Sequence, residues 1–200
     1  MNPVPAGAER NIRNATERDT SSMIKFITGN NGKFKEVQTI LPNVEQLDID
    51  LPEIQEIDAR EIIRTKLNAA FEHAEGEFIV EDTSLYLDCL HGLPGPLIKW
   101  FLKTIGNEGL VELSEKFGND IAVAKTVIGY AKDRNEIHFF EGSINGKIVK
   151  SEGGSGFGWD PIFLPDGQSK TFAQMSGSEK SLLSMRTTAA RKLKDFLSSL

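Results

Sequence analysis

The sequence has 200 residues, enough for one domain of ordinary size or two small lobes. Hydrophobic residues make up 39% of the chain and charged residues 26%, which is typical of a protein that buries a core and excludes disorder by composition. The 23 basic and 29 acidic side chains give a formal charge of −6, which argues against nucleic acid as a partner, because non-specific binding to phosphates requires a cationic surface.

Residues 1–22 differ from the rest of the chain. They are polar and lack the apolar run of a secretory signal, so we expect a flexible extension; an organelle-targeting peptide is an alternative, although such peptides usually lack the acids found here. No apolar stretch approaches the roughly 18 residues that would predict a membrane span. The single cysteine, Cys89, cannot form an internal disulfide and is expected to be an interior thiol, which fits a cytoplasmic protein.

The chain continues with a predicted strand, a turn and a helix. Residues 23–28 are apolar and β-branched, and a Gly-Asn-Asn-Gly turn follows them. Apolar residues at helical spacing predict a helix over residues 33–41, which Pro42 ends. Residues 44–49 form a second candidate strand.

A second helix is expected to begin after Asp58 and to run through residue 73. Asp58 would cap it, with Glu61 three positions later as the partner in a capping box. Residues 78–80 are an apolar strand that is expected to end abruptly at Glu81 and Asp82. Strands that alternate with helices in this way predict an α/β sheet with parallel neighbours.

The second half of the chain is richer in strands. Residues 121–131 and 136–149 are predicted as two long strands joined by a polar turn, which together form a second lobe. Residues 181–200 are predicted as one terminal helix with an apolar face. That face consists of Leu182, Met185, Ala189, Leu193, Phe196 and Leu200. We therefore expect residues 23–200 to form a single two-lobed domain.

The first turn could bind phosphate. In Thr28-Gly29-Asn30-Asn31-Gly32-Lys33 the glycines let backbone amides approach a ligand, and the helix that follows presents its positive end. The Lys33 ammonium adds a charge suited to a phosphate oxygen. An ordinary strand-to-helix turn with a solvated lysine explains the same residues, and the order of a Walker A loop is absent.

Acidic residues mark a possible metal or base site. Glu81 and Asp82 follow a buried strand, where α/β sheets usually hold ligands, and a carboxylate there could hold Mg²⁺ or accept a proton from water. The alternative is that Asp82 caps a turn over residues 82–84. Glu53 is a possible second metal ligand, although by itself it is only an acid in a loop.

Two segments rich in glycine and proline could shape a pocket. Residues 92–100 form a rigid loop that could serve as a pocket wall. Residues 153–161 place two aromatic rings and Asp160 among glycines, so a ring could stack on a nucleobase while the carboxylate accepts hydrogen bonds from it. A tight loop with packed aromatic rings is the alternative. Lys180 and Arg186 could reach the same pocket from the terminal helix, or could belong to a solvated basic face.

The order of these motifs is specific. Along the chain they read T-G-N-x-x-K, L-P-E, E-D-T-S-L, G-L-P-G-P-x-I-K-W-F and G-F-G-W-D-P-I-F. This series resembles the inosine triphosphate pyrophosphatase family over nearly the whole chain beyond residue 23. The resemblance implies a two-lobed mixed sheet flanked by helices with a central cleft, usually in a homodimer. It also implies Mg²⁺, with Mn²⁺ as a substitute, and hydrolysis of ITP, dITP and XTP to the monophosphate and pyrophosphate.

The resemblance also implies roles for individual residues. Catalysis would fall to Asp82, Lys33 and Lys66, and the metal would be held by Glu53 and Asp82. The substrate contacts would be Thr28, Gly29, Asn30, Lys33, Lys66 and Thr83, then Phe157, Gly158, Trp159 and Asp160 at the base, then Lys180, Met185 and Arg186.

One position departs from the family. The family reads Ser-His-Arg where this chain reads Ser184-Met185-Arg186, and a thioether cannot donate a hydrogen bond to a purine. Base selectivity is therefore expected to be weaker than in the family, because a lost hydrogen bond to the correct base erodes discrimination. Two other functions stay open: a Maf-like pyrophosphatase of modified pyrimidine nucleotides, and a nucleotide-binding protein that has lost catalysis.

Overall fold

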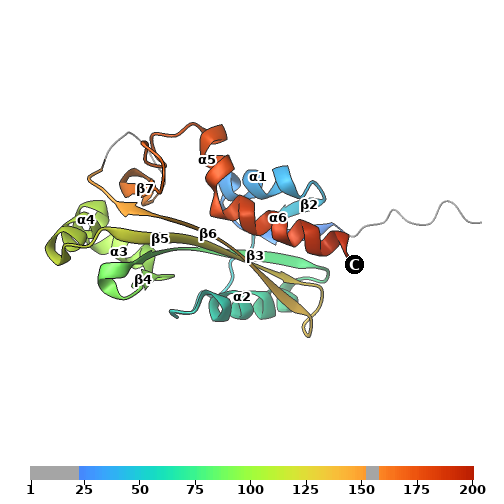
Figure 1. The fold of residues 1–200 in the computed structure, drawn as a ribbon. Coiled ribbons are helices and arrows are strands. Elements are labelled where there is room, and N and C mark those ends of the chain that lie inside the picture. The colour runs from blue at the N-terminus through green and yellow to red at the C-terminus, as the bar shows by residue number, and fades with distance from the viewer. Residues whose placement is uncertain (1–22, 152–157) are drawn as a thin grey trace, which may run out of the picture.

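One mixed sheet organises the part of the chain that the computed structural model describes, residues 23–151 and 158–200 (Figure 1). Its strand order is β2-β1-β3-β5-β6-β7, and β4 pairs with β3 beside this path. β1 runs parallel to β2 and β3, and the remaining pairs are antiparallel. The strands are β1 (Ile24–Ile27), β2 (Val44–Leu47), β3 (Phe78–Leu87), β4 (Pro94–Gly95), β5 (Ile121–Ala131), β6 (Ile137–Ile148) and β7 (Phe163–Pro165).

Helices cover both faces of this sheet. Figure 1 shows α2 on one face, α1 and α6 on the other, and α3 and α4 at the end of the sheet near β4. The helices are α1 (Asn31–Ile40), α2 (Ala59–His73), α3 (Ile98–Thr104), α4 (Gly106–Phe117), α5 (Gly177–Leu183) and α6 (Met185–Ser198), with short 3₁₀ turns at Asp88–Leu90 and Asp160–Ile162. The predicted α/β class with a mixed sheet is thus confirmed, whereas the division into residues 1–22 and 23–200 stays a prediction.

The alternation of side chains along β3 places a polar seam between two apolar clusters. On the face toward α1 and α6, Ile79 belongs to one buried cluster and Leu85 to another. Between them on that face lie Glu81 and Thr83, because successive side chains of a strand point to opposite faces. The Thr83 hydroxyl lies 2.9 Å from the hydroxyl of Thr126 on β5. Polar groups therefore gather where the apolar packing is interrupted.

β3 is much longer than the sequence suggested. The strand predicted for residues 78–80 does not end at Glu81 and Asp82 but continues to Leu87, paired residue by residue with β5. The alternative in which Asp82 caps a turn is therefore wrong as well. The two acids do not end the strand, because antiparallel pairing with β5 continues past them and satisfies the backbone groups along that edge.

The predicted terminal helix is two helices. α5 ends at Leu183, and the side chain of Ser184 caps α6 by accepting a hydrogen bond from the Thr187 amide at 3.3 Å. Leu182 and Leu200 are 76% and 71% exposed, so the predicted apolar face is correct only from Met185 to Phe196. A serine that caps a helix competes with the continuation of the helix before it.

The predicted cap of α2 is correct in part. Asp58 accepts a hydrogen bond from the Arg60 amide at 2.8 Å. The carboxylate of Glu61 lies instead 3.5 Å from Arg64, one turn along the helix. The exposed Glu61 side chain can bond either to the backbone amide of Asp58 or to Arg64, with a similar free energy. The sequence pattern therefore could not decide between these two partners.

A glycine on β6 sets the position of α6 on the sheet. A Cβ atom at Gly142 would lie 1.9 Å from the carbonyl oxygen of Met185, a distance that no side chain tolerates. The start of α6 therefore approaches the sheet backbone directly and brings Arg186 toward β3. Among the described residues, no helix is both long and apolar enough to cross a lipid bilayer.

Candidate active site

A cleft opens at a gap along one edge of β3. β1 pairs with this edge at Phe78 and Ile79, and β4 pairs with it at Leu85 and Tyr86. Over the described residues, no strand covers the stretch between these pairs. A cavity of about 850 Å³ lies there and is lined by three successive residues of β3, Glu81, Asp82 and Thr83.

Most of the predicted site residues meet in this cleft. Those that line it are Asn30, Lys33, Glu53, Lys66, Asp82, Thr83, Gly158, Trp159, Asp160, Lys180, Met185 and Arg186. Thr28 and Gly29 line a smaller cavity of about 220 Å³, which shares Lys33, Glu53 and Lys66 with the cleft. Phe157 lies outside the described residues. The proline-rich loop predicted as a pocket wall also lines the cleft, from Pro96 to Trp100. The chemical roles of these residues remain predictions.

The predicted phosphate turn is held by its own side chains. Asn30 caps α1, where its carbonyl oxygen accepts a hydrogen bond from the Lys33 amide at 3.0 Å. The Thr28 hydroxyl accepts another from the Asn30 amide at 3.1 Å. The positive end of α1 is therefore fixed beside the cleft, an arrangement that favours anions.

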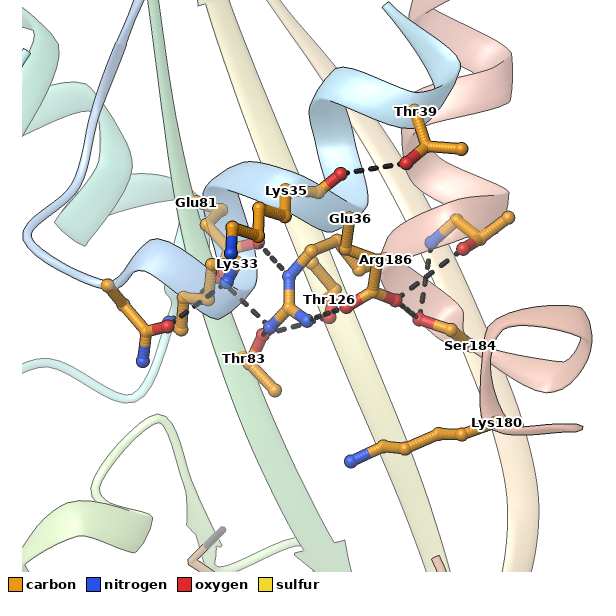
Figure 2. A network of polar contacts seen from close by, with 12 residues as sticks. Lys33, Lys35, Glu36, Thr39, Glu81, Thr83, Thr126, Lys180, Ser184 and Arg186 are labelled. Atoms are coloured by element: carbon orange, nitrogen blue, oxygen red, sulfur yellow. Dashed lines mark hydrogen bonds and ion pairs between the residues drawn. The ribbon is translucent and has the colours of Figure 1, made fainter. Parts of the chain in front are cut away.

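An ion network joins α1, β3 and α6 across the polar seam (Figure 2). The Glu81 carboxylate lies 2.7 Å from Lys33 Nζ and 2.5 Å from Arg186 Nε. Arg186 also lies 2.5 Å from Glu36, which accepts a further hydrogen bond from Ser184. Sequence reasoning missed Glu36, although it lies one turn after Lys33 on the same helix, a spacing that puts both on one face.

The charges of this network suit its burial. Burial alone would raise the pKa of Glu81, but the charges of Arg186 and Lys33 lower it to about 2. In turn, the two carboxylates keep Arg186 charged despite its burial and raise its pKa. These contacts hold α1 and α6 against β3 through the ionised side chains of Glu81 and Arg186.

The donors of Arg186 are mostly occupied. The guanidinium has five N–H groups, and it donates twice to Glu81, once to Glu36 and once to Thr83. Among the described residues this leaves at most one N–H, on Nη1, for a carbonyl of a purine. The predicted contact with the base thus stays a prediction. If it forms, it can use only this one N–H group of Nη1.

A second group of charges lies on the opposite side of β3. Glu53 is held between Lys66 Nζ at 2.5 Å and Lys99 Nζ at 3.2 Å. Burial opposes ionisation of Glu53, but the hydrogen bonds and charges of the two lysines lower its pKa. Sequence reasoning missed Lys99, which belongs to the loop interpreted only as a wall.

Asp82 lies beside this group and is the more basic carboxylate. Burial raises its pKa, although the Ser84 hydroxyl and the charges of Lys66 and Lys33 act in the opposite direction. The charge of Lys66 lowers the pKa of Glu53 and opposes the rise in that of Asp82, and all three side chains line the cleft. A carboxylate with a raised pKa is better suited to accept a proton than one held ionised by close cations.

The donor set fits a hard divalent cation. Within residues 23–151 and 158–200, no group of three or more His, Cys, Asp or Glu side chains could hold a metal by itself. Mg²⁺ requires less of the protein, because it is usually bound by one or two carboxylates together with water and substrate phosphates. Glu53 and Asp82 both line the cleft and would supply such a pair of oxygen ligands.

The predicted base pocket is more closely packed than expected. Trp159 is only 6% exposed, and its ring lies 5.4 Å from that of Phe163 in the core. Little of the ring is therefore available to stack on a purine. Asp160 lies 2.5 Å from Lys180 Nζ, so the two form a pair at the cleft wall. Met185 is 5% exposed and packs in the same core, as its place on the apolar face of the helix indicated.

Asn107 fixes the backbone of this wall, a contact that sequence reasoning missed. From α4 its side-chain amide donates a hydrogen bond to the Gly158 carbonyl at 3.0 Å. Gly158 has φ 59°, in the left-handed region that favours glycine. The side-chain oxygen of Asn107, Oδ1, is buried and has no partner among the described residues, which costs stability. Asn107 therefore contributes little to the stability of the fold, but its hydrogen bond holds the backbone of Gly158 at the cleft wall.

The replacement Asn107→Ala is expected to raise KM for a substrate bound in this cleft about fivefold and to leave kcat nearly unchanged, because one hydrogen bond worth about 1 kcal/mol no longer holds Gly158. The free energy of unfolding should stay equal or increase, since the unpaired oxygen is removed with the donor. Steady-state kinetics and urea denaturation measure both. Asn68→Ala, on the exposed face of α2, is the matched control. A large loss of stability with an unchanged KM would mean that Asn107 serves folding alone.

The fold and this cleft define an α/β protein that gathers lysines and carboxylates at the uncovered edge of a mixed sheet. Residues 24–196 match the model of the Ham1 family, and the chain belongs to that family. It is 42% identical over 180 residues to inosine triphosphate pyrophosphatase of Schizosaccharomyces pombe, covering 88% of this chain and 95% of that one. The enzyme of the same name from Saccharomyces cerevisiae is 41% identical over 193 residues, covering 89% and 97%.

Solved structures show the same fold. The Ham1 protein of Staphylococcus aureus has a TM-score of 0.75 and 28% identity, covering 88% of this chain and 98% of that one. A nucleoside-triphosphatase described as a dITP/XTP pyrophosphatase, from Mycobacterium abscessus, has a TM-score of 0.67 and 25% identity over 87% and 98%. The family resemblance inferred from the motifs is confirmed.

Proposed function

We propose that this chain hydrolyses nonstandard purine nucleoside triphosphates, ITP, dITP and XTP, to the monophosphate and pyrophosphate, and so removes them from the nucleotide pool. The relatives named as inosine triphosphate pyrophosphatases support this substrate class. The observation that carries the proposal is the meeting of Lys33, Lys66, Glu53 and Asp82 in one cleft beside the positive end of α1.

The lysines bind and neutralise the triphosphate. Lys33 and Lys66 now face Glu81 and Glu53 at 2.7 and 2.5 Å, and both line the cleft. A triphosphate that enters can share these ammonium groups with the carboxylates. Fixed positive charge then stabilises the charge that develops on the oxygens when the bond between the α and β phosphates breaks.

Asp82 acts on the water. Its half-buried carboxylate, with a raised pKa, accepts a proton from the attacking water or orients it, a contribution of about a hundredfold or more. Glu53 and Asp82 would hold Mg²⁺, or Mn²⁺ in its place, since all-oxygen ligands suit both. When bound, the ion supplies positive charge that polarises the phosphoryl oxygens.

Arg186 recognises the base. The N–H group left on Nη1 donates to the 6-keto oxygen of hypoxanthine or xanthine, whereas the amino group of adenine offers no acceptor there. Met185 adds no hydrogen bond to the base. Discrimination between purine bases therefore rests on Arg186 and on the segment from Gly158 to Asp160 that lines the cleft. Two further proposals follow from the family: the protein is a homodimer, and it acts in the cytoplasm.

A panel of nucleotides tests the proposal. With Mg²⁺ present, we expect release of pyrophosphate from ITP, dITP and XTP with kcat/KM at least about tenfold above that for ATP, because one unmatched polar contact has at least this effect. Chelation of the metal should abolish turnover. Binding without turnover would indicate a nucleotide-binding protein instead, and a preference for modified pyrimidine nucleotides would indicate a Maf-like activity.

A further inference from the structure

Ser84 makes direct contact with the carboxylate at the centre of the site. Its hydroxyl donates a hydrogen bond of 2.5 Å to Oδ2 of Asp82. The two residues are two positions apart on β3, and side chains at this spacing in a strand point to the same face. The contact is thus a consequence of the extended backbone.

Besides Asp82, this hydroxyl bonds to the Tyr86 phenol, an interaction that opposes the rise in the pKa of Tyr86 caused by burial. Ser84 is 1% exposed, so water does not compete for its proton. The strand that carries it is paired with β5 along its whole length, at Asp82 with Val127 and at Ser84 with Lys125. Pairing with β5 therefore fixes the backbone at both residues along one edge, and the hydroxyl can hold Asp82 in one orientation.

Hydrogen bonding at one carboxylate oxygen determines what the other can do. With Oδ2 engaged by Ser84, Oδ1 is the oxygen that this contact leaves to a ligand in the cleft that Asp82 lines. Partners that orient a ligating carboxylate in this way usually strengthen metal binding by about 10–100-fold. A hydroxyl is suited to this purpose, because it donates without adding a charge that would compete with the cation.

We propose that Ser84 is a positioning residue that fixes Asp82 so that one carboxylate oxygen is presented to a divalent cation bound with the triphosphate. The inference rests on the proposed function, since it requires Asp82 to be a metal ligand. It adds a residue that acts through Asp82 and does not itself touch the substrate.

Binding of Mn²⁺ is the readout, because it does not depend on turnover. The full chain is saturated with the nonhydrolysable α,β-methylene analogue of dITP and titrated with Mn²⁺, and the unbound ion is followed by electron paramagnetic resonance. Ser84→Ala should weaken Mn²⁺ binding about tenfold or more. Ser84→Thr retains a hydroxyl and should stay within about threefold of the unchanged protein, on the same scale.

A matched control separates this effect from a general loss of packing. Ser114 is also buried, and its hydroxyl donates to the Val111 carbonyl within α4 at 2.9 Å. Ser114→Ala should lower stability without changing the affinity for Mn²⁺. If Ser84→Ala does not fold, Ser84→Thr and Ser84→Val make the same comparison, because these two side chains have the same shape and differ in the hydroxyl.

The outcomes distinguish the inference from the function on which it rests. Equal Mn²⁺ affinity in the Ser84→Ala and unchanged proteins, or equal weakening by Ser84→Thr and Ser84→Val, would overturn the role of Ser84 and leave the metal site intact. If the unchanged protein does not bind Mn²⁺ in the presence of the analogue, the assignment of Asp82 as a metal ligand is wrong, and the role of Ser84 is overturned with it.

Discussion

Asp82→Asn is expected to lower kcat for dITP by about a hundredfold or more, because asparagine keeps the shape of the side chain but can neither accept a proton from water nor balance a divalent charge. Stability should change little or increase, since burial already opposes the ionised form of this carboxylate. Release of pyrophosphate at saturating Mg²⁺ measures the first effect and urea denaturation the second.

Asp166→Asn is the control for this experiment. Asp166 is exposed in the turn that follows β7, so the same loss of one negative charge there should leave kcat unchanged. Near-normal turnover of dITP by the Asp82→Asn protein would show that Asp82 is neither the base nor an essential metal ligand, and the mechanism proposed above would have to be abandoned.

Glu81→Gln is expected to reduce the free energy of unfolding by about 3 kcal/mol, because it removes the carboxylate that neutralises two cations at the polar seam. The lower end of the usual range applies, since Arg186 keeps its pair with Glu36 at 2.5 Å. Activity should fall as well, because Lys33 and Arg186 lose the group that orients them. Glu61→Gln, which breaks the exposed pair with Arg64, should cost less than about 0.5 kcal/mol.

The dependence on pH provides an independent check of the same ion pair. The pKa of Glu81 is lowered from 4.5 to about 2 in the folded protein, so its ionised form stabilises the fold above pH 4.5. That stabilisation is lost as the pH falls from 4.5 toward 2. The difference in stability between the unchanged and Glu81→Gln proteins should therefore shrink over this range, and a difference that stays constant there would mean that its cause is not charge.

Periodicity and turn residues were enough to predict much of the fold. The first strand and helix, the Asp58 cap and the long hairpin of β5 and β6 depend on local patterns that short segments contain. β3 could not be predicted in full, because its extension past two acids depends on pairing with β5, some forty residues away in sequence. The break at Ser184 was hidden for a similar reason, since the apolar spacing continues across it.

The candidate site was predicted as a set of residues more successfully than as a set of contacts. Motif order brought Lys33, Lys66, Glu53 and Asp82 to attention, and all four line one cleft. Their partners were missed, because contacts such as Arg186 with Glu36 join residues 150 positions apart. The sequence also suggested Glu81 and Asp82 as one acidic pair, whereas neighbouring strand positions point to opposite faces and give the two acids different partners.

The edge of β3 that no described strand covers between Ile79 and Leu85 determines how the cleft responds to substitutions in this strand. A ligand in that opening can be reached from above and below the sheet at the same time, through the guanidinium on one side and the Asp82 carboxylate on the other. The proposed contacts with the base and with the phosphates thereby depend on one strand, because Glu81 of β3 holds Arg186 on one face and Asp82 of β3 lies on the other. A substitution that alters the twist of this strand should disturb recognition of the base and cleavage of the phosphate together, even where it touches neither.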